Sequence, residues 1–253
     1  MPVAIFAPAR RAAIWLATAV LTFGLQGCMA GSRSIPAKDA LALSASALAG
    51  SENYAFAGEL SLYDAGGEVG SRSAFEGQVT GHGNLKLQWK PSELSAMETG
   101  DSASYETYRP LQLLEALKGD DATAAYAEKP TQSKPVKLVV RLDDEVAKRR
   151  VAEELRQQLA MLRSTYATGS KETGVGKAAA ILSEAEARME AAIKSLKVRT
   201  VCYWTADPKN WFPSQLKEES QLSYEWEGRS LNEKRSSETN FHNDADGDTI
   251  KGS

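Results

Sequence analysis

Two histidines and one serine–lysine spacing are the first residues to test for chemistry. His82 stands between two glycines and His242 stands near the acidic C-terminal segment, and no third metal ligand or nucleophile is spaced to join either one. Ser214 and Lys217 match the S-x-x-K spacing of penicillin-binding enzymes, but the companion S-D-N and K-T-G elements are absent. We therefore interpret Ser214 and Lys217 as strand positions. We expect no enzymatic activity, no cofactor and no metal site.

The C-terminal segment contains carboxylates at alternate positions, a spacing that suggests metal binding. Asp244, Asp246 and Asp248 are arranged like the first ligands of a calcium loop, but the glycine falls two places too early for an EF-hand. We interpret residues 243–253 as an acidic flexible tail because they are poor in apolar side chains. Weak binding of a divalent cation by this tail is the alternative.

Cys28 is the one residue for which the sequence specifies a covalent modification. Arg10 and Arg11 precede the 14-residue apolar run 12–25, which is too short to span a bilayer and has the pattern of a secretory signal. The stretch Leu25-Gln26-Gly27-Cys28 that follows resembles the lipobox of bacterial lipoproteins and departs from it at Gln26. The resemblance implies cleavage before Cys28 and acylation of its thiol. The alternatives are an ordinary secretory peptide with a chance cysteine and an uncleaved short anchor.

The lipobox interpretation fixes the domain organisation that we expect. Residues 1–27 are the signal peptide, 28–36 a lipidated tether, 37–242 a single domain and 243–253 the tail. The mature chain then works outside the cytoplasm, and acylated Cys28 joins it to the bacterial cell membrane. Two or more acyl chains bind a membrane far more firmly than one. The membrane is thus the first partner that we predict, and a protein partner stays unknown.

Charge and cysteine content limit the other partners. The signal removes two arginines and no acidic residue, so the mature 226 residues carry 28 basic and 33 acidic side chains, a net charge of −5. An acidic body gives no electrostatic reason to bind nucleic acid.

With Cys28 acylated, Cys202 has no cysteine to pair with. We expect Cys202 to be an inert buried residue in a strand, and an exposed reactive thiol is the alternative.

Hydrophobic periodicity predicts an α+β domain that begins with a helix and a meander. A helix over 37–49 ends at Gly50, and period-two alternation then predicts a half-buried strand over 54–62. Further strands are expected at 73–80 and 84–89, with a fourth candidate at 104–108. A proline-led leucine helix follows over 110–118, and then strands at 122–128 and 136–142.

The second half of the domain is predicted to hold two helices and three strands. Asp143 can cap a helix over 143–163 with the apolar stripe Val151, Leu155, Leu159 and Leu162. Its cluster 148–150 is interpreted as a solvated basic face, with contact to phospholipid headgroups as the alternative. Residues 165–176 are expected to form a loop, and Ser183 to open a capping box, although the helix could begin near Lys177. Strands follow at 198–205, 214–226 and 229–241.

This order of elements, with the Pro110-Leu111-Gln112-Leu113-Leu114 helix and the Asp207-Pro208-Lys209 turn, resembles the LolA and LppX/LprG-like lipoprotein superfamily over most of residues 37–242. The resemblance implies a curled antiparallel sheet, an unclosed half-barrel, with helices packed on its concave side. It also implies an apolar cavity between sheet and helices, in which several members carry lipids or acyl chains. Other relatives are sensors or have no known ligand.

Two hypotheses for function therefore stay open. In the first, a membrane-anchored, non-enzymatic lipoprotein binds or carries a lipid or other apolar ligand in a cavity that the helices leave uncovered. In the second, side chains fill the half-barrel, and the protein is an interaction or sensor module of the envelope. The aromatics Trp89, Tyr203, Trp204, Trp211, Tyr224 and Trp226 suit either an apolar site or a packed core. The residues predicted to line the cavity are Phe56, Leu60, Leu62, Leu87, Leu216, Leu222 and Trp226.

Overall fold

The structure is a computed structural model that describes residues 35–64, 66–81, 83–91, 111–131, 133–169 and 175–243. From Pro36 onward these residues belong to one compact unit. Outside the described residues lie the predicted signal peptide, Cys28 with most of its tether, His82, the candidate strand at 104–108 and the carboxylates of the tail. The buried hydrophobic residues of the described part lie between Ala40 and Phe241. A form of the chain that begins at Met29 therefore keeps this whole core.

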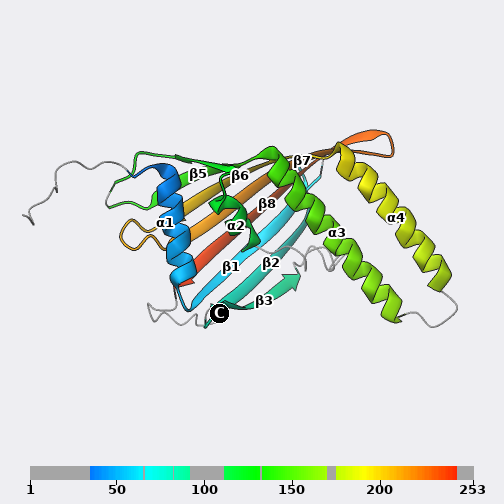
Figure 1. Ribbon diagram of the computed structural model, residues 1–253, viewed down its shortest axis with the longest axis horizontal. Helices are drawn as coiled ribbons and strands as arrows, with labels where there is room; N and C mark the ends of the chain where they lie inside the picture. Colours follow the sequence, from blue (N-terminus) through cyan, green and yellow to red (C-terminus); the bar gives the residue numbers. More distant parts are fainter. Residues whose placement is uncertain are drawn as a thin grey trace, which may run out of the picture. The chain divides into compact units, whose positions relative to one another are not determined.

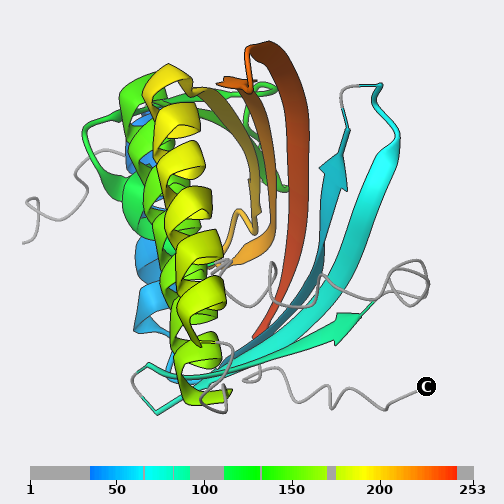
Figure 2. The ribbon, with the colours of Figure 1, turned by 90° about the vertical axis from the view of Figure 1, so that its right-hand side faces the viewer.

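In the described residues, eight strands form one antiparallel sheet with helices on one of its faces (Figure 1, Figure 2). The strand order is β3-β2-β1-β8-β7-β6-β5-β4, with β3 at one edge and β4 at the other, so the sheet does not close into a barrel. This confirms the predicted α+β class with a curled, unclosed sheet. The strands are β1 (Tyr54–Tyr63), β2 (Val69–Thr80), β3 (Asn84–Pro91), β4 (Ala122–Tyr126), β5 (Val136–Leu142), β6 (Lys197–Ala206), β7 (Pro213–Trp226) and β8 (Arg229–Asn243).

Alternation and turn chemistry explain why these segments are strands. Along β5 every second side chain from Val136 to Leu142 is buried, whereas Lys137 and Arg141 face solvent. Between β7 and β8, Glu227 and Gly228 both have positive φ, 51° and 76°, as a two-residue type I′ hairpin requires. The turn occupies the two residues that the predicted strands 214–226 and 229–241 leave between them.

The helices of the described part are α1 (Ala37–Gly50), α2 (Gln112–Lys118), α3 (Asp144–Gly169) and α4 (Val175–Ser195). Asp143 caps α3 as predicted, because its Oδ1 accepts hydrogen bonds from the backbone N–H of Glu145 at 3.0 Å and of Val146 at 3.2 Å. The loop predicted over 165–176 is wrong at both ends, since α3 continues to Gly169 and α4 begins at Val175. Ser183 lies inside α4 and caps nothing, because strong helix formers precede it from Lys177 onward.

The helices α3 and α4 form an antiparallel hairpin (Figure 1), and Met161 and Ile181 on it are 46% and 67% exposed. Ion pairs join the two helices, Arg156 to Glu190 at 2.7 Å and Arg163 to Glu186 at 2.6 Å. The predicted apolar stripe of α3 begins buried at Val151, but Leu162 is 38% exposed. The stripe therefore runs past the part of the helix that the sheet covers.

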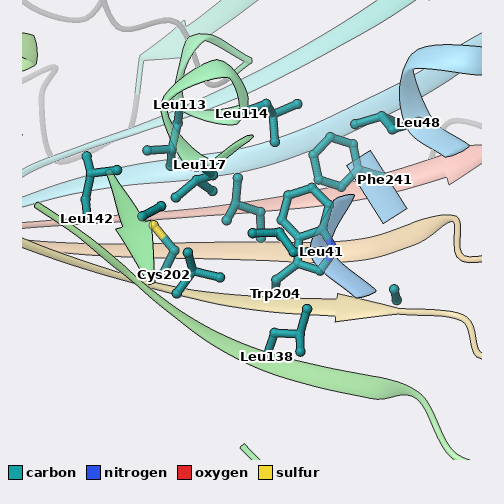
Figure 3. Packing of buried hydrophobic residues seen from close by; sticks show 14 of the residues in the cluster. Leu41, Leu48, Leu113, Leu114, Leu117, Leu138, Leu142, Cys202, Trp204 and Phe241 are labelled. Carbon is teal, nitrogen blue, oxygen red and sulfur yellow. The ribbon is translucent and has the colours of Figure 1, made fainter. Parts of the chain in front are cut away.

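The core beneath α1 and α2 is tightly packed (Figure 3). Phe241 of β8 and Trp204 of β6 have ring centroids 6.4 Å apart, and Leu41 and Leu48 of α1 belong to the same cluster. The indole N–H of Trp204 donates to Ser44 Oγ at 2.8 Å, which satisfies a buried polar group and ties α1 to the sheet. Leu41, Ala45 and Leu48 lie on the buried face of α1.

Two glycines of β1 and β2 are covered by aromatic rings from the opposite strand. Phe56 pairs with Gly77, and Gly58 pairs with Phe75. A β-carbon added to Gly77 would lie 2.3 Å from Phe56 Cζ. One added to Gly58 would lie 2.7 Å from Phe75 Cζ and 2.0 Å from the backbone oxygen of Glu238. The rings, and at Gly58 the neighbouring backbone too, therefore occupy the space that side chains at the glycines would need. Gly58 does not lie on an open ligand-facing surface.

Candidate functional site

A cavity of about 510 Å³ lies between the α3–α4 hairpin and the strands β1, β7 and β8. We call it the hairpin cavity. Its volume is within the range of small-molecule sites, and such sites are mostly apolar. Aliphatic and aromatic side chains form most of the lining: Leu60, Leu62, Tyr63, Val151, Leu155, Met189, Ala192, Ile193, Leu196, Leu222, Tyr224, Trp226 and Leu231.

The structure brings four of the seven predicted cavity residues together in this lining: Leu60, Leu62, Leu222 and Trp226. Phe56 and Leu216 lie elsewhere on the same sheet face, where they are 1% and 2% exposed within the packed core. Leu87 of β3 is half-buried against that core. Sequence periodicity predicts a single apolar sheet face, whereas helices and aromatic rings fill one end of this face and leave the other hollow.

Apolar side chains of the two hairpin helices form the helical side of the cavity. Val151 and Leu155 project from α3, and Met189, Ile193 and Leu196 come from α4 and the residue after it. Both stripes are visible in the sequence as helical spacing. Helical spacing does not determine the angle at which the hairpin leaves the sheet. The spacing therefore does not distinguish a cavity wall from a packed interface.

A chain of four charges alternates in sign between α3 and the sheet. Arg150 of α3 donates to Glu218 Oε1 of β7, and Arg235 Nη2 of β8 lies 3.7 Å from the same oxygen. Arg235 Nη1 then donates to Glu154 Oε2 of α3 at 2.8 Å. We call this set the ion chain. Glu218 is 1% exposed and Arg235 is 8% exposed, so the centre of the chain is withdrawn from water.

The ion chain corrects the prediction that residues 148–150 are a solvated basic face. Arg150 is turned inward because it lies one helical turn from Glu154 on the face of α3 that meets the sheet. The even position of Glu218 between Leu216 and Leu222 puts its carboxylate on the buried face of β7, but this spacing does not show which cation the carboxylate meets there. A charged residue at a core-facing position of an alternating strand is the signal that would have found it.

Hydroxyl groups complete the surroundings of Glu218. Ser220 Oγ donates to Glu218 Oε1 at 3.0 Å and shares a hydrogen bond of 2.8 Å with Thr200 Oγ1. Cys202 lies next to this network on β6 and is fully buried, which confirms the prediction of a core position. Burial raises the pKa of the Cys202 thiol well above its usual range, and the Glu218 carboxylate raises it further. Cys202 is therefore held as an unreactive thiol.

Polar side chains are concentrated at the rim of the hairpin cavity. The Tyr224 hydroxyl donates to Glu233, and burial followed by this hydrogen bond raises the pKa of Tyr224. Lys234 Nζ lies 5.6 Å above the ring of Tyr63. Arg188 of α4 pairs with Glu227 at 2.6 Å, which fixes the helix to the β7–β8 turn.

The residues first tested for chemistry are not assembled into a site. Ser214 and Lys217 lie in β7, as predicted, and point to opposite faces of it. Lys217 Nζ pairs with Glu219 at 2.9 Å, and His242 is exposed in β8. Among the described residues, no group of three or more His, Cys, Asp or Glu side chains is close enough to hold a metal ion. Within the same residues, none of the helices is both long and apolar enough to cross a membrane.

The aromatics whose role the sequence left open are divided between core and site. Tyr224 and Trp226 line the hairpin cavity, whereas Trp204 is 1% exposed in the core. Trp89 and Trp211 are half-buried against the core, and Tyr203 is 42% exposed.

Comparison with known proteins adds little to this description. No family model and no curated protein matches the chain. Among solved structures, an acyl-CoA thioesterase II from Mycobacterium marinum aligns with 82% of this chain and 90% of its own at 9% identity and a TM-score of 0.13. A TM-score this low supports no statement about a shared fold or activity.

Proposed function

We propose that this chain is a membrane-anchored lipoprotein that binds or carries a lipid or other apolar molecule in the hairpin cavity and catalyses no reaction. The observation that carries the proposal is the cavity itself, about 510 Å³ with an aliphatic and aromatic lining. Packed cores leave few voids larger than a water molecule, so a hollow of this size needs an occupant or an entering solvent. An apolar ligand is the occupant that its lining favours.

The anchor is the second part of the proposal. Arg10, Arg11, the apolar run 12–25 and Cys28 have the order of a lipoprotein signal. Acylation of Cys28 would place the domain outside the cytoplasm at the surface of the cell membrane. We propose on the same grounds that the chain is related to the LolA and LppX/LprG-like superfamily, whose half-barrels have this one-sided helical cover.

An interaction or sensor module is the second candidate, and two observations favour it. The sheet face under α1 and α2 is filled with packed side chains such as Phe56, Phe75 and Phe241. In addition, Met161 and Ile181 on the hairpin are 46% and 67% exposed. Exposed apolar side chains at one end of a molecule are a feature of protein-binding surfaces. In this alternative, the hairpin binds a partner and the cavity carries no ligand.

Native mass spectrometry of the form that begins at Met29 distinguishes the two candidates. The ligand-binding function predicts that the protein co-purifies with extractable lipid, or takes up an apolar fluorophore with one saturable site while it stays folded. A lipid-free spectrum together with no saturable uptake of added lipid would decide for the interaction module.

A cavity-filling variant tests the location of the ligand. Ala192 of α4 lines the hairpin cavity, whereas its neighbour Ala191 faces solvent. Ala192→Trp places an indole in the cavity and is expected to reduce fluorophore binding by about tenfold or more, because it occupies a large part of the volume that the ligand needs. Ala191→Trp adds the same side chain outside the cavity and should leave binding unchanged. Equal effects of the two variants would exclude the hairpin cavity as the site.

A further inference from the structure

A pair of opposite charges interrupts the mostly aliphatic lining of the hairpin cavity. Among the charged residues of the lining, the side chains of Arg235 and Glu154 are 10% and 15% exposed, whereas that of Lys234 at the rim is 43% exposed. Withdrawing charges from water costs several kcal/mol for each ion, and their attraction recovers this only with good geometry. A purely apolar ligand gains nothing from this pair.

Arg235 and Glu154 are the outer half of the ion chain, and α3 is attached to the sheet without them. The inner half joins Arg150 to Glu218, which also accepts from Ser220. Glu154 projects from α3 into the cavity wall and reaches Arg235 Nη1 at 2.8 Å. A rotation of the Glu154 side chain toward solvent would open the guanidinium to the cavity and leave the Arg150–Glu218 pair in place.

We propose that the hairpin cavity binds a single-chain amphiphile with an anionic head group, and that Arg235 holds this head group in place of Glu154. The inference rests on the proposed ligand-binding function and adds the chemistry of the ligand to it. A planar guanidinium with five N–H donors is suited to an oxyanion, and a carboxylate is the simplest head group that can take two of these donors.

Charge balance favours an anion over the other head groups. With Glu154 inside, the ion chain has two positive and two negative groups, and a ligand carboxylate that replaces Glu154 keeps this sum at zero. A hydroxyl head group would leave Arg235 without the charge of Glu154 in a site of low dielectric. An ammonium head group would meet Arg235 at close range, which is repulsive.

The volume of the cavity is comparable with that of a ligand with one chain. If each non-hydrogen atom takes roughly the 30 Å³ that a water molecule has in the liquid, 510 Å³ holds about 17 of them. Tetradecanoate is close to this size. A lipid with two such chains would leave one of them outside the cavity.

Competition of three amphiphiles against an apolar fluorophore tests the inference on the form that begins at Met29. Tetradecanoate, tetradecanol and tetradecyltrimethylammonium share an unbranched chain of 14 carbons and differ in the polar group at its first carbon. The wild type is expected to bind tetradecanoate about tenfold or more tighter than tetradecanol, because a hydrogen bond to a charged group is added, and to bind the ammonium compound most weakly.

Variants in the ion chain separate recognition from stability. Arg235→Met should remove the preference for the acid over the alcohol. Glu154→Gln should instead raise the affinity for tetradecanoate at least about threefold, because it weakens the internal competitor for Arg235. Arg150→Met breaks the same ion chain outside the cavity lining, and it should lower the melting temperature without changing the preference. Glu154→Gln still gives a readout if Arg235→Met fails to fold.

Each outcome supports or overturns the inference. Equal binding of acid and alcohol by the wild type would overturn it and leave the ligand-binding function standing. A preference for the acid that survives in Arg235→Met, or an affinity that falls in Glu154→Gln, would also overturn it. If none of the three amphiphiles displaces the fluorophore because the fluorophore itself does not bind, the proposed function is wrong and the inference falls with it.

Discussion

Removing the charge of Glu218 is the perturbation that should destabilise the domain most for a change of one atom. Glu218→Gln keeps the size and shape of the side chain but leaves Arg150 and Arg235 with Glu154 as the one carboxylate of the ion chain. The side chain is 1% exposed, so water cannot replace the lost charge. Breaking a buried ion pair by removing one partner costs about 3–5 kcal/mol.

Glu219 offers a matched control on the same strand. Its carboxylate also has two cationic neighbours, Lys217 at 2.9 Å and Lys234 at 3.7 Å, but it lies on the other face of β7 with 28% of the side chain exposed. Exposed pairs contribute about 0–1 kcal/mol because solvent screens them. Glu218→Gln and Glu219→Gln therefore make the same chemical change in two environments.

Urea denaturation and thermal unfolding of the form that begins at Met29 measure the difference in stability between the two variants. Glu218→Gln should lower the urea midpoint without changing the slope. At about 2–4 °C per kcal/mol it should lower the melting temperature by about 10 °C. Glu219→Gln should shift the melting temperature by a few degrees at most. Equal losses in the two variants would refute the claim that burial of the ion chain controls its contribution to stability.

Four further outcomes are expected. Radiolabelled palmitate should enter the wild type and not Cys28→Ala, which should accumulate as precursor, and equal labelling of both would contradict the anchor. A thiol reagent should modify Cys202 slowly in the folded protein and fast in denaturant, since burial also raises its pKa. Gly77→Ala should lower the free energy of unfolding by more than about 1 kcal/mol, because its β-carbon would lie 2.3 Å from Phe56 Cζ. Gly70→Ala should not, because its β-carbon would lie no closer than 3.7 Å to any atom outside the adjoining residues. Because the pKa of Tyr224 is raised in the fold, its stabilising contribution is present below pH 10 and is lost as the pH rises above that value, and Tyr224→Phe should remove this alkaline loss.

The sheet was predictable from the sequence because each strand contains its own evidence. The alternation from Val136 to Leu142 and the Glu227-Gly228 turn place β5 and the β7–β8 hairpin without reference to the rest of the chain. The largest boundary errors fall in the α3–α4 hairpin, where helix formers continue past Arg163 and precede Ser183. The glycine at which α3 ends, Gly169, lies more than one turn beyond Arg163, where the sequence was expected to leave the helix. The start of β2 at Val69, four residues before the predicted one, is a smaller error.

The site was predictable only in part because a cavity is a property of packing between elements. Periodicity identified Leu222 and Phe56 as members of one sheet face, but it does not record that Phe56 covers Gly77 while Leu222 faces a hollow. The ion chain was missed for a similar reason. Arg150 and Glu218 are 68 residues apart, and only the docking of α3 on β7 brings the two charges together.

The alternation of charge in the ion chain fixes the axial position of α3 on the sheet. The aliphatic stripe of Val151 and Leu155 would allow the helix to slide, since one leucine fills a groove about as well as the next. A slide of one turn would bring Glu154 opposite Glu218, and like charges repel strongly at a site that excludes water. The helix therefore has a single docked position. Insertions or deletions in the far half of the hairpin can change its length without shifting the part that forms the cavity.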